Sequence, residues 1–245
     1  MGLFDLFSKK KADAPKASGR DTERLGRLVA NKFSQNLDRQ DAIEQLSRMG
    51  TKDSAAALLK RFDWQLDPSI TDQEEKENCL RGIVAVGEGA LEPVRNYAKK
   101  AESLMWPLRV LKNIVSGQAL TDELLSMLDQ FDTEYTRNVE PKLQLITELA
   151  EHKTDEVRTA LEPFLEDASE PVRFAAVTSV FAIGSSDSLP ALVAALEQEE
   201  SLRVKNRIAE GLAQKSWELP EALQPVAAKG LPANYRVQGN KVQAG

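Results

Sequence analysis

Two residue types that build metal and redox sites are almost missing from this chain. It has one cysteine, Cys79, and one histidine, His152, among 245 residues. Structural zinc and di-iron sites need several ligands at defined spacing, and a single cysteine cannot close an internal disulfide. We therefore expect no metal site, no cofactor and no histidine-based triad. Cys79 is predicted to lie in the core, and His152 on the surface.

The low content of glycine, proline and aromatic residues also limits the kinds of protein that this chain can be. Glycine and proline number only 13 and 11, and aromatic residues make up 6% of the chain. The apolar residues are mostly leucine, alanine and valine, which favours helices. No apolar run approaches the roughly 18 residues of a membrane span, and no secretory pattern opens the chain. We find no glycine-rich phosphate loop and no nucleophile elbow. A cytoplasmic protein without catalytic residues is expected.

The charge is uneven along the chain. The net charge is −6, yet residues 1–20 carry five basic and two acidic side chains, which leaves −9 on the remainder. Nucleic-acid binding needs many cationic contacts to phosphates. An acidic body therefore argues against a nucleic-acid partner.

A repeat of 32 residues runs through the second half of the chain. Shifted by 32 positions, Asp167 falls on Glu199 and Arg173 falls on Lys205, with matched apolar positions around them. Repetition at 20–50 residues is typical of stacked helical arrays. The segment 167–184, "DASEPVRFAAVTSVFAIG", has apolar residues over two faces, as a helix does when it packs on its partner and on the next repeat.

The same rhythm extends upstream. Amphipathic segments end at four glycines, and a second amphipathic segment follows each of them. With two further segments that lack the glycine, the pattern predicts about six antiparallel helix pairs. The four glycines are Gly50, Gly87, Gly117 and Gly184.

Asp-x4-Val-Arg, an alanine-rich helix and Ile-Gly together resemble HEAT repeats, in particular the short bacterial HEAT-like repeats also found in phycobilin-lyase-related proteins. The resemblance is good over 155–215 and fair over 36–154. It departs from the pattern in the second and third pairs, where Glu75–Lys76 and Met105–Trp106 stand in place of Val-Arg. It implies an all-α, right-handed α-solenoid whose usual work is binding. Bilin attachment belongs to only some members.

Two sets of residues are candidates for special roles. We predict a structural charge ladder, in which Arg173 at the start of its helix pairs with an acid of a neighbouring turn. The tryptophans lie near helix junctions and are candidate anchors for a partner, because tryptophan is enriched at interface hot spots. The ladder comprises Asp167, Arg173, Glu199 and Lys205, and the anchors are Trp64, Trp106 and Trp217.

Both ends of the array are expected to be capped. Leu25, Leu28, Val29 and Phe33 share one helical face and predict an N-terminal cap helix. At the other end, Gly239-Asn240 predicts a two-residue hairpin, with a frayed tail as the alternative. The predicted domains are a flexible basic segment over 1–20, the solenoid over 21–230, and a tail or capping hairpin over 231–245.

The first residues form an amphipathic stretch followed by lysines. This pattern is typical of a short helix that touches an anionic membrane weakly, at the inner face of the membrane. A frayed end, or docking on a partner or in the chain's own groove, are the alternatives. The candidate contact residues are Leu3, Phe4, Leu6, Phe7, Lys9, Lys10 and Lys11.

Two functions remain open at this stage. The first is an adaptor that binds another protein along the groove of the solenoid, since stacked repeats create extended concave surfaces. The alternative is an enzyme of the phycobilin-lyase type that holds a tetrapyrrole in an apolar pocket.

Overall fold

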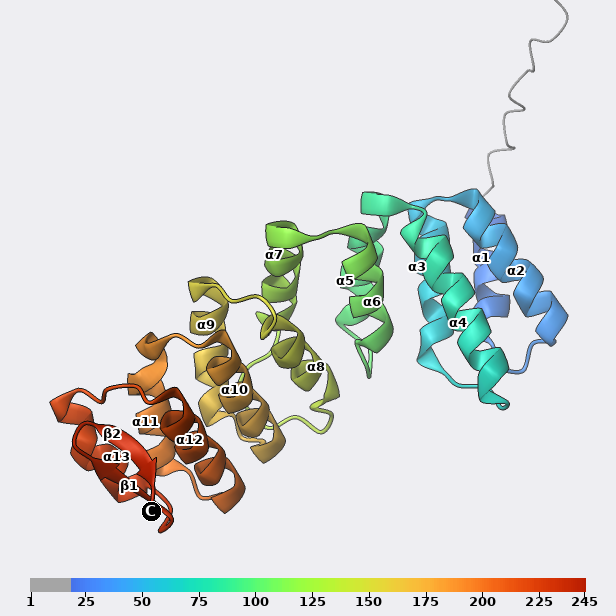
Figure 1. The fold of residues 1–245 in the computed structure, drawn as a ribbon. Helices are drawn as coiled ribbons and strands as arrows, with labels where there is room; N and C mark the ends of the chain where they lie inside the picture. Colours follow the sequence, from blue (N-terminus) through green and yellow to red (C-terminus); the bar gives the residue numbers. More distant parts are fainter. Residues whose placement is uncertain (1–18) are drawn as a thin grey trace, which may run out of the picture. The chain divides into compact units, whose positions relative to one another are not determined.

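The computed structural model describes residues 19–245, which form two compact units that divide after Val86. In this part of the chain the elements are thirteen α-helices, short 3-10 turns and one β-hairpin (Figure 1). The prediction of an all-α array is confirmed. The assignment of 21–230 to one domain stays a prediction, and each unit is described by itself.

Unit 1 consists of two layers of two helices. Helices α1 and α3 pack against each other and against α2, and α4 packs against α2 and α3. Apolar side chains such as Leu25 and Val29 of α1 are fully buried between the layers. The bounds are α1 Gly19–Ala30, α2 Asn36–Met49, α3 Lys52–Leu59 and α4 Ser69–Val84.

The predicted packing face of α1 is wrong at one position. Phe33 was expected beside Leu25 and Val29, but its side chain is 84% exposed. The reason is that α1 ends at Ala30, so Phe33 lies in the turn before α2 and no longer follows the helical spacing.

Unit 2 consists of two rows of helices. In Figure 1, α6, α8, α10 and α12 form one row, and α5, α7, α9, α11 and α13 form the other. Packing of α8 on α10 and of α10 on α12 joins the first row. The bounds are α5 Leu91–Ala98, α6 Met105–Ile114, α7 Gly117–Leu128, α8 Glu140–Leu149, α9 Asp155–Leu161, α10 Glu170–Ile183, α11 Leu189–Gln198, α12 Leu202–Lys215 and α13 Gln224–Gly230.

Helix α10 shows why its apolar residues cover two faces. On one side Ser179 Oγ donates a hydrogen bond to the carbonyl of Ile146 on α8, at 3.1 Å. On the other side the buried ring of Phe181 lies against Gly211 of α12. A helix between two neighbours in a row, with a second row behind it, has little surface left for solvent.

The glycines predicted to stop helices adopt the left-handed conformation. Gly50, Gly87, Gly117 and Gly184 have φ between 58° and 84°, which side chains with a Cβ rarely adopt. Gly50 and Gly184 are the C-caps of α2 and α10. Helices α4 and α6 end three residues before their predicted glycines, at Val84 and Ile114, and Gly117 is the first residue of α7, so the glycine signal marks the helix end itself only at Gly50 and Gly184.

The C-terminal residues form the hairpin rather than a tail. Strand β1 (Tyr235–Gln238) pairs antiparallel with β2 (Lys241–Ala244) around Gly239 and Asn240. Strand β2 packs on α12, with Val242 buried, and the Leu219 amide donates to the Asn240 carbonyl at 2.7 Å. An isolated hairpin is marginal in water. Here it covers the end of the first row.

Within the described residues, every helix is too short or too polar to cross a membrane.

The close approach of α10 and α12 depends on Gly211. A Cβ at this position would lie 2.3 Å from the Phe181 ring, which is buried and cannot move aside freely. Gly211→Ala is therefore expected to lower the free energy of unfolding by about 1–3 kcal/mol, despite alanine's higher helix propensity. Chemical denaturation measures it, with exposed Gln214→Ala of α12 as the control. Equal stability of the two variants would show that the helices do not approach so closely.

Candidate functional site

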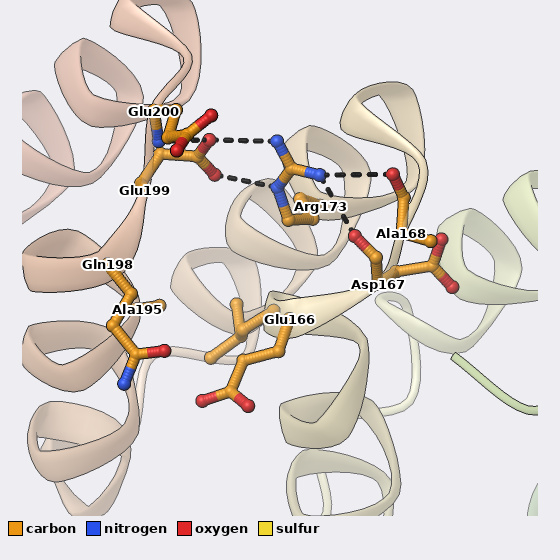
Figure 2. Close-up of a pocket in the computed structure, with 9 residues that line it drawn as sticks. Glu166, Asp167, Ala168, Arg173, Ala195, Gln198, Glu199 and Glu200 are labelled. Carbon is orange, nitrogen blue, oxygen red and sulfur yellow. Dashed lines mark hydrogen bonds and ion pairs between the residues drawn. The ribbon is translucent and has the colours of Figure 1, made fainter. Parts of the chain in front are cut away.

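The predicted partner of Arg173 is found in the next repeat. Its guanidinium binds Glu199 with two hydrogen bonds, of 2.7 and 2.8 Å, and donates a third to the backbone carbonyl of Asp167 at 2.9 Å (Figure 2). The Glu199 side chain is nearly buried, while 19% of the Arg173 side chain is exposed. The pair joins the start of α10 to the turn between α11 and α12.

Asp167 has a different partner, which the sequence did not indicate. Its carboxylate accepts a hydrogen bond from Lys142 of α8 at 2.6 Å, and both side chains are buried. Lys142 precedes Arg173 by 31 residues, as Arg173 precedes Lys205 by 32, so the periodicity could have revealed it. In both pairs, Lys142–Asp167 and Arg173–Glu199, the acid thus binds the base of the preceding repeat.

Each acid also orders the turn before the next helix. Asp167 accepts from the Ser169 amide at 2.8 Å, just before α10. Glu199 accepts from the Ser201 amide at 2.8 Å, just before α12. Each carboxylate therefore accepts hydrogen bonds from a backbone amide before a helix and from a base of the neighbouring repeat. The same residue thus orders the turn and holds the two repeats together.

Lys205 is the last predicted member of the ladder. It matches Arg173 in register, but the residue 26 positions further, where Glu199 stands relative to Arg173, is the uncharged Leu231. The role of Lys205 in the ladder stays a prediction.

The ion pair with Arg173 changes the titration of Glu199. Burial raises the pKa of the Glu199 carboxyl, but hydrogen bonds from Arg173 and from the Ser201 and Glu200 amides outweigh burial. The net pKa lies below its ordinary value of 4.5. Such a carboxylate stabilises the fold while it is ionised, and this contribution is lost as the pH falls through the lowered pKa.

Unit 1 has a buried charge cluster of its own. Glu75 of α4 accepts from Arg39 of α2 with two bonds of 2.8 Å, and from Arg61 with one of 2.7 Å. The three side chains are at most 2% exposed. Glu75 stands where Val172 stands in the repeat pattern. At this position a buried ion pair therefore joins the helices of unit 1, in place of an apolar contact.

A second acid completes this cluster. Asp72 pairs with Arg61 and with Lys76, each at 2.8 Å, and accepts from the Leu66 amide at 2.9 Å. Burial raises its pKa, but the bonds from Lys76 and Arg61 prevail and lower it below 3.8. The cluster fixes the connection between α3 and α4, where the spacing of the repeat is interrupted.

The three tryptophans do not form one site. The ring of Trp64 lies beneath the Arg61 guanidinium at 3.8 Å, as part of the unit 1 cluster. Trp106 of α6 is only 5% exposed, so its ring belongs to the core. Trp217, after α12, stacks on Phe181 at 5.7 Å. Partner anchoring by the two half-buried rings, Trp64 and Trp217, stays a prediction.

Cys79 and His152, the two residues of reactive type, lie in surroundings typical of residues with a structural role. Cys79 is fully buried, and burial raises the pKa of its thiol, so the nucleophilic thiolate is disfavoured. The ring of His152 makes a 2.7 Å hydrogen bond with Thr121 Oγ1. Over residues 19–245, no group of three or more histidine, cysteine or acidic side chains is arranged to hold a metal ion. The predicted membrane-contact residues, 3–11, lie outside the described part of the chain.

A groove between α6 and α8 has the character of a binding site. It measures about 410 Å³, and Met105, Leu108 and Leu143 supply its apolar surface. Met105 is 53% exposed, which is unusual for a large apolar side chain. The remaining lining residues are Arg109, Lys112, Glu140, Gln144, Thr147 and Glu148.

Polar contacts hold the rim of this α6–α8 groove in place. The Gln144 amide donates to Ser103 Oγ at 3.0 Å and to Glu140 at 2.8 Å, and its oxygen accepts from the Leu104 amide. Lys112 pairs with Glu148 at 2.9 Å across the groove. The rim of the groove is therefore held by contacts within the chain itself.

Comparison with known proteins agrees with this geometry. Residues 121–213 match the family model for HEAT repeats, and this stretch includes the Lys142–Asp167 and Arg173–Glu199 pairs. The predicted resemblance to HEAT repeats is confirmed over these residues. No curated protein was found to match the chain.

The Arg173–Glu199 pair is testable by stability. Arg173→Ala leaves a nearly buried acid without its base, so we expect a loss of roughly 1–3 kcal/mol in the free energy of unfolding. The difference from wild type should be largest at neutral pH, shrink below the ordinary pKa of 4.5, and disappear as the pH falls through the lowered pKa of Glu199. Arg203→Ala, which breaks an exposed pair with Glu170, is the control. A pH-independent difference would refute the role of the ionised Glu199.

Glu75 should matter more than any surface acid of unit 1. Glu75→Leu leaves Arg39 and Arg61 buried without their shared carboxylate, at an expected cost of about 3–5 kcal/mol. Glu74→Leu, which changes an exposed neighbour on α4, is the control. Thermal unfolding followed by circular dichroism measures both. Equal melting temperatures would contradict the importance of the cluster.

Proposed function

We propose that this chain, a HEAT-repeat protein over residues 121–213, is a protein-binding adaptor whose α6–α8 groove receives an apolar side chain of its partner. HEAT repeats are commonly protein-interaction scaffolds. The observation that carries the proposal is the half-exposed Met105 beside Leu108 and Leu143, within a rim of mutually bonded polar residues.

The composition of the groove suits a protein partner. Protein interfaces combine an apolar centre with a polar rim, and methionine adapts its shape to different side chains. The groove volume falls within the range of ligand sites, about 300–1,000 Å³. Arg109, whose guanidinium lies 4.4 Å from the Trp106 ring, and Glu140 supply charge of both signs for orientation.

The row of helices offers room for a longer partner segment. Beyond α8, the α10–α12 part of the row carries Arg203, whose guanidinium lies 3.7 Å from the Phe174 ring, and Arg207, which donates to Thr178 at 3.3 Å. Stacked repeats bind extended segments along such a face. The affinity is expected to depend chiefly on the apolar groove, because exposed charges contribute little.

The test is capture of partners from the native cell with quantitative mass spectrometry. The bait is the immobilised full chain in three forms: wild type, Met105→Asp and Phe33→Asp. The last changes an exposed apolar side chain of unit 1 as a matched control. Proteins retained by wild type and by Phe33→Asp should be reduced about tenfold with Met105→Asp, because a carboxylate in the groove must be desolvated. Equal retention by all three forms would contradict the proposed site.

The tetrapyrrole alternative stays a prediction from the resemblance. A shifted visible absorption band, on mixing the purified chain with a bilin, would identify it.

A further inference from the structure

A second groove lies in unit 1, between α2 and α4. It measures about 800 Å³, and the acids Asp41, Glu44 and Glu74 line it with a single base, Arg81. The other lining residues are Leu37, Gln40, Ile43, Ser47, Asn78, Gly82 and Ala85. Its floor is shallow near Gly82, where a Cβ would lie 2.2 Å from Ser47 Oγ.

The α2–α4 groove changes character along its length. At the C-terminal end of α2 the lining is small, with Ser47 and Gly82. The acids follow in the middle. At the N-terminal end Leu37 is 77% exposed, and Ile70, one turn before Glu74 on α4, is 72% exposed. Leu37 lines the groove, and Ile70 lies outside the lining, one turn before Glu74, so this end of the acidic groove suits a covering segment that is apolar and then basic.

The chain enters unit 1 at the small end of this groove. Thr22 Oγ1, in the first turn of α1, donates to Met49 Sδ at the end of α2 (3.6 Å), so Gly19 lies beside the C-terminal end of α2. An extended chain of eleven residues, 8–18, reaches roughly 36–40 Å. Helix α2, with 14 residues, is only about 21 Å long. The first residues can therefore reach either end of the groove.

We propose that residues 3–11 of this chain dock in its own α2–α4 groove. Followed back from Gly19, the sequence presents Lys11, Lys10 and Lys9 and then Phe7, Leu6, Phe4 and Leu3. The groove presents acids and then exposed apolar side chains in the same order. The lysines lie beside Asp41, Glu44 and Glu74, and the apolar residues cover Leu37 and Ile70.

Docking in the same chain controls what the segment can touch elsewhere. The apolar side chains that cover Leu37 are those that would enter a membrane surface, so a docked segment is withheld from lipid. The inference does not rest on the proposed adaptor function, whose groove belongs to unit 2.

The test is photo-crosslinking in the full chain, with benzoylphenylalanine in place of Phe7 and crosslinked peptides mapped by mass spectrometry. Adducts should fall on α2 and α4 near Leu37 and Ile70. Leu37→Asp should lower their yield about tenfold, because it removes one apolar contact and places a carboxylate that must be desolvated against the apolar side chains of the segment. Leu202→Asp, which changes a similarly exposed leucine of α12, should leave the yield unchanged. Circular dichroism verifies that both variants fold.

A mixture of isotopically heavy and light chains separates intramolecular docking from docking on a second copy. Crosslinks only between heavy and light chains would overturn the proposal. So would adducts outside α2 and α4, no adducts, or a yield unaffected by Leu37→Asp. Phosphatidylserine vesicles are then added, so that the segment can bind a membrane surface instead of the groove. A probe that labels lipid equally in wild type and in Leu37→Asp would assign the segment to the membrane and overturn docking.

Discussion

The structure depends on a base of one helix pair that is held by a buried acid of the next. Lys142 with Asp167 and Arg173 with Glu199 repeat this arrangement in unit 2, and each acid also orders the turn before a first-row helix. Burying a charge is costly unless a partner compensates it. A repeat that slipped against its neighbour would leave both groups unpaired, so the pairs specify how repeats stack more than they add net stability.

This stacking positions the surfaces that have binding character. When α8 is held against α10, and α10 against α12, the first row presents its side chains in a fixed order, and the α6–α8 groove keeps its bonded rim without a partner. Unit 1 achieves the same result by other means, since Glu75 joins Arg39 and Arg61 within the layer interface. In both units, buried charged side chains hold neighbouring helices together, and apolar side chains stay exposed in a groove.

The sequence was most informative where the repeat is regular. Spacing of 32 residues predicted α10 and α12, because periodic burial and periodic helix ends have the same physical cause. It left Asp167 and Glu199 as the two candidate partners of Arg173, and the structure shows Glu199. It did not reveal Lys142, which stands at a spacing of 31 and follows a proline. It did not reveal the Arg39–Glu75 pair, whose acid lies inside a helix rather than in a turn.

The grooves could not be predicted for a different reason. Met105 stands three residues before the buried Leu108, at the spacing of a core residue, and only the three-dimensional packing shows that it is left uncovered. Phe33 was misplaced because its helix ends three residues earlier than the apolar pattern suggests. Hydrophobic spacing in a sequence shows which residues are apolar, but it does not show which of them a neighbouring helix covers.

The most direct test of this account is a double-mutant cycle between Arg173 and Glu199. The unfolding free energies of wild type, Arg173→Ala, Glu199→Ala and the double variant are compared at neutral pH. If the pair specifies the stacking, the double variant should be more stable than the sum of the single losses implies, with a coupling of about 1–3 kcal/mol. Losses that add to within about 0.5 kcal/mol would contradict the account, because the two residues would then act independently.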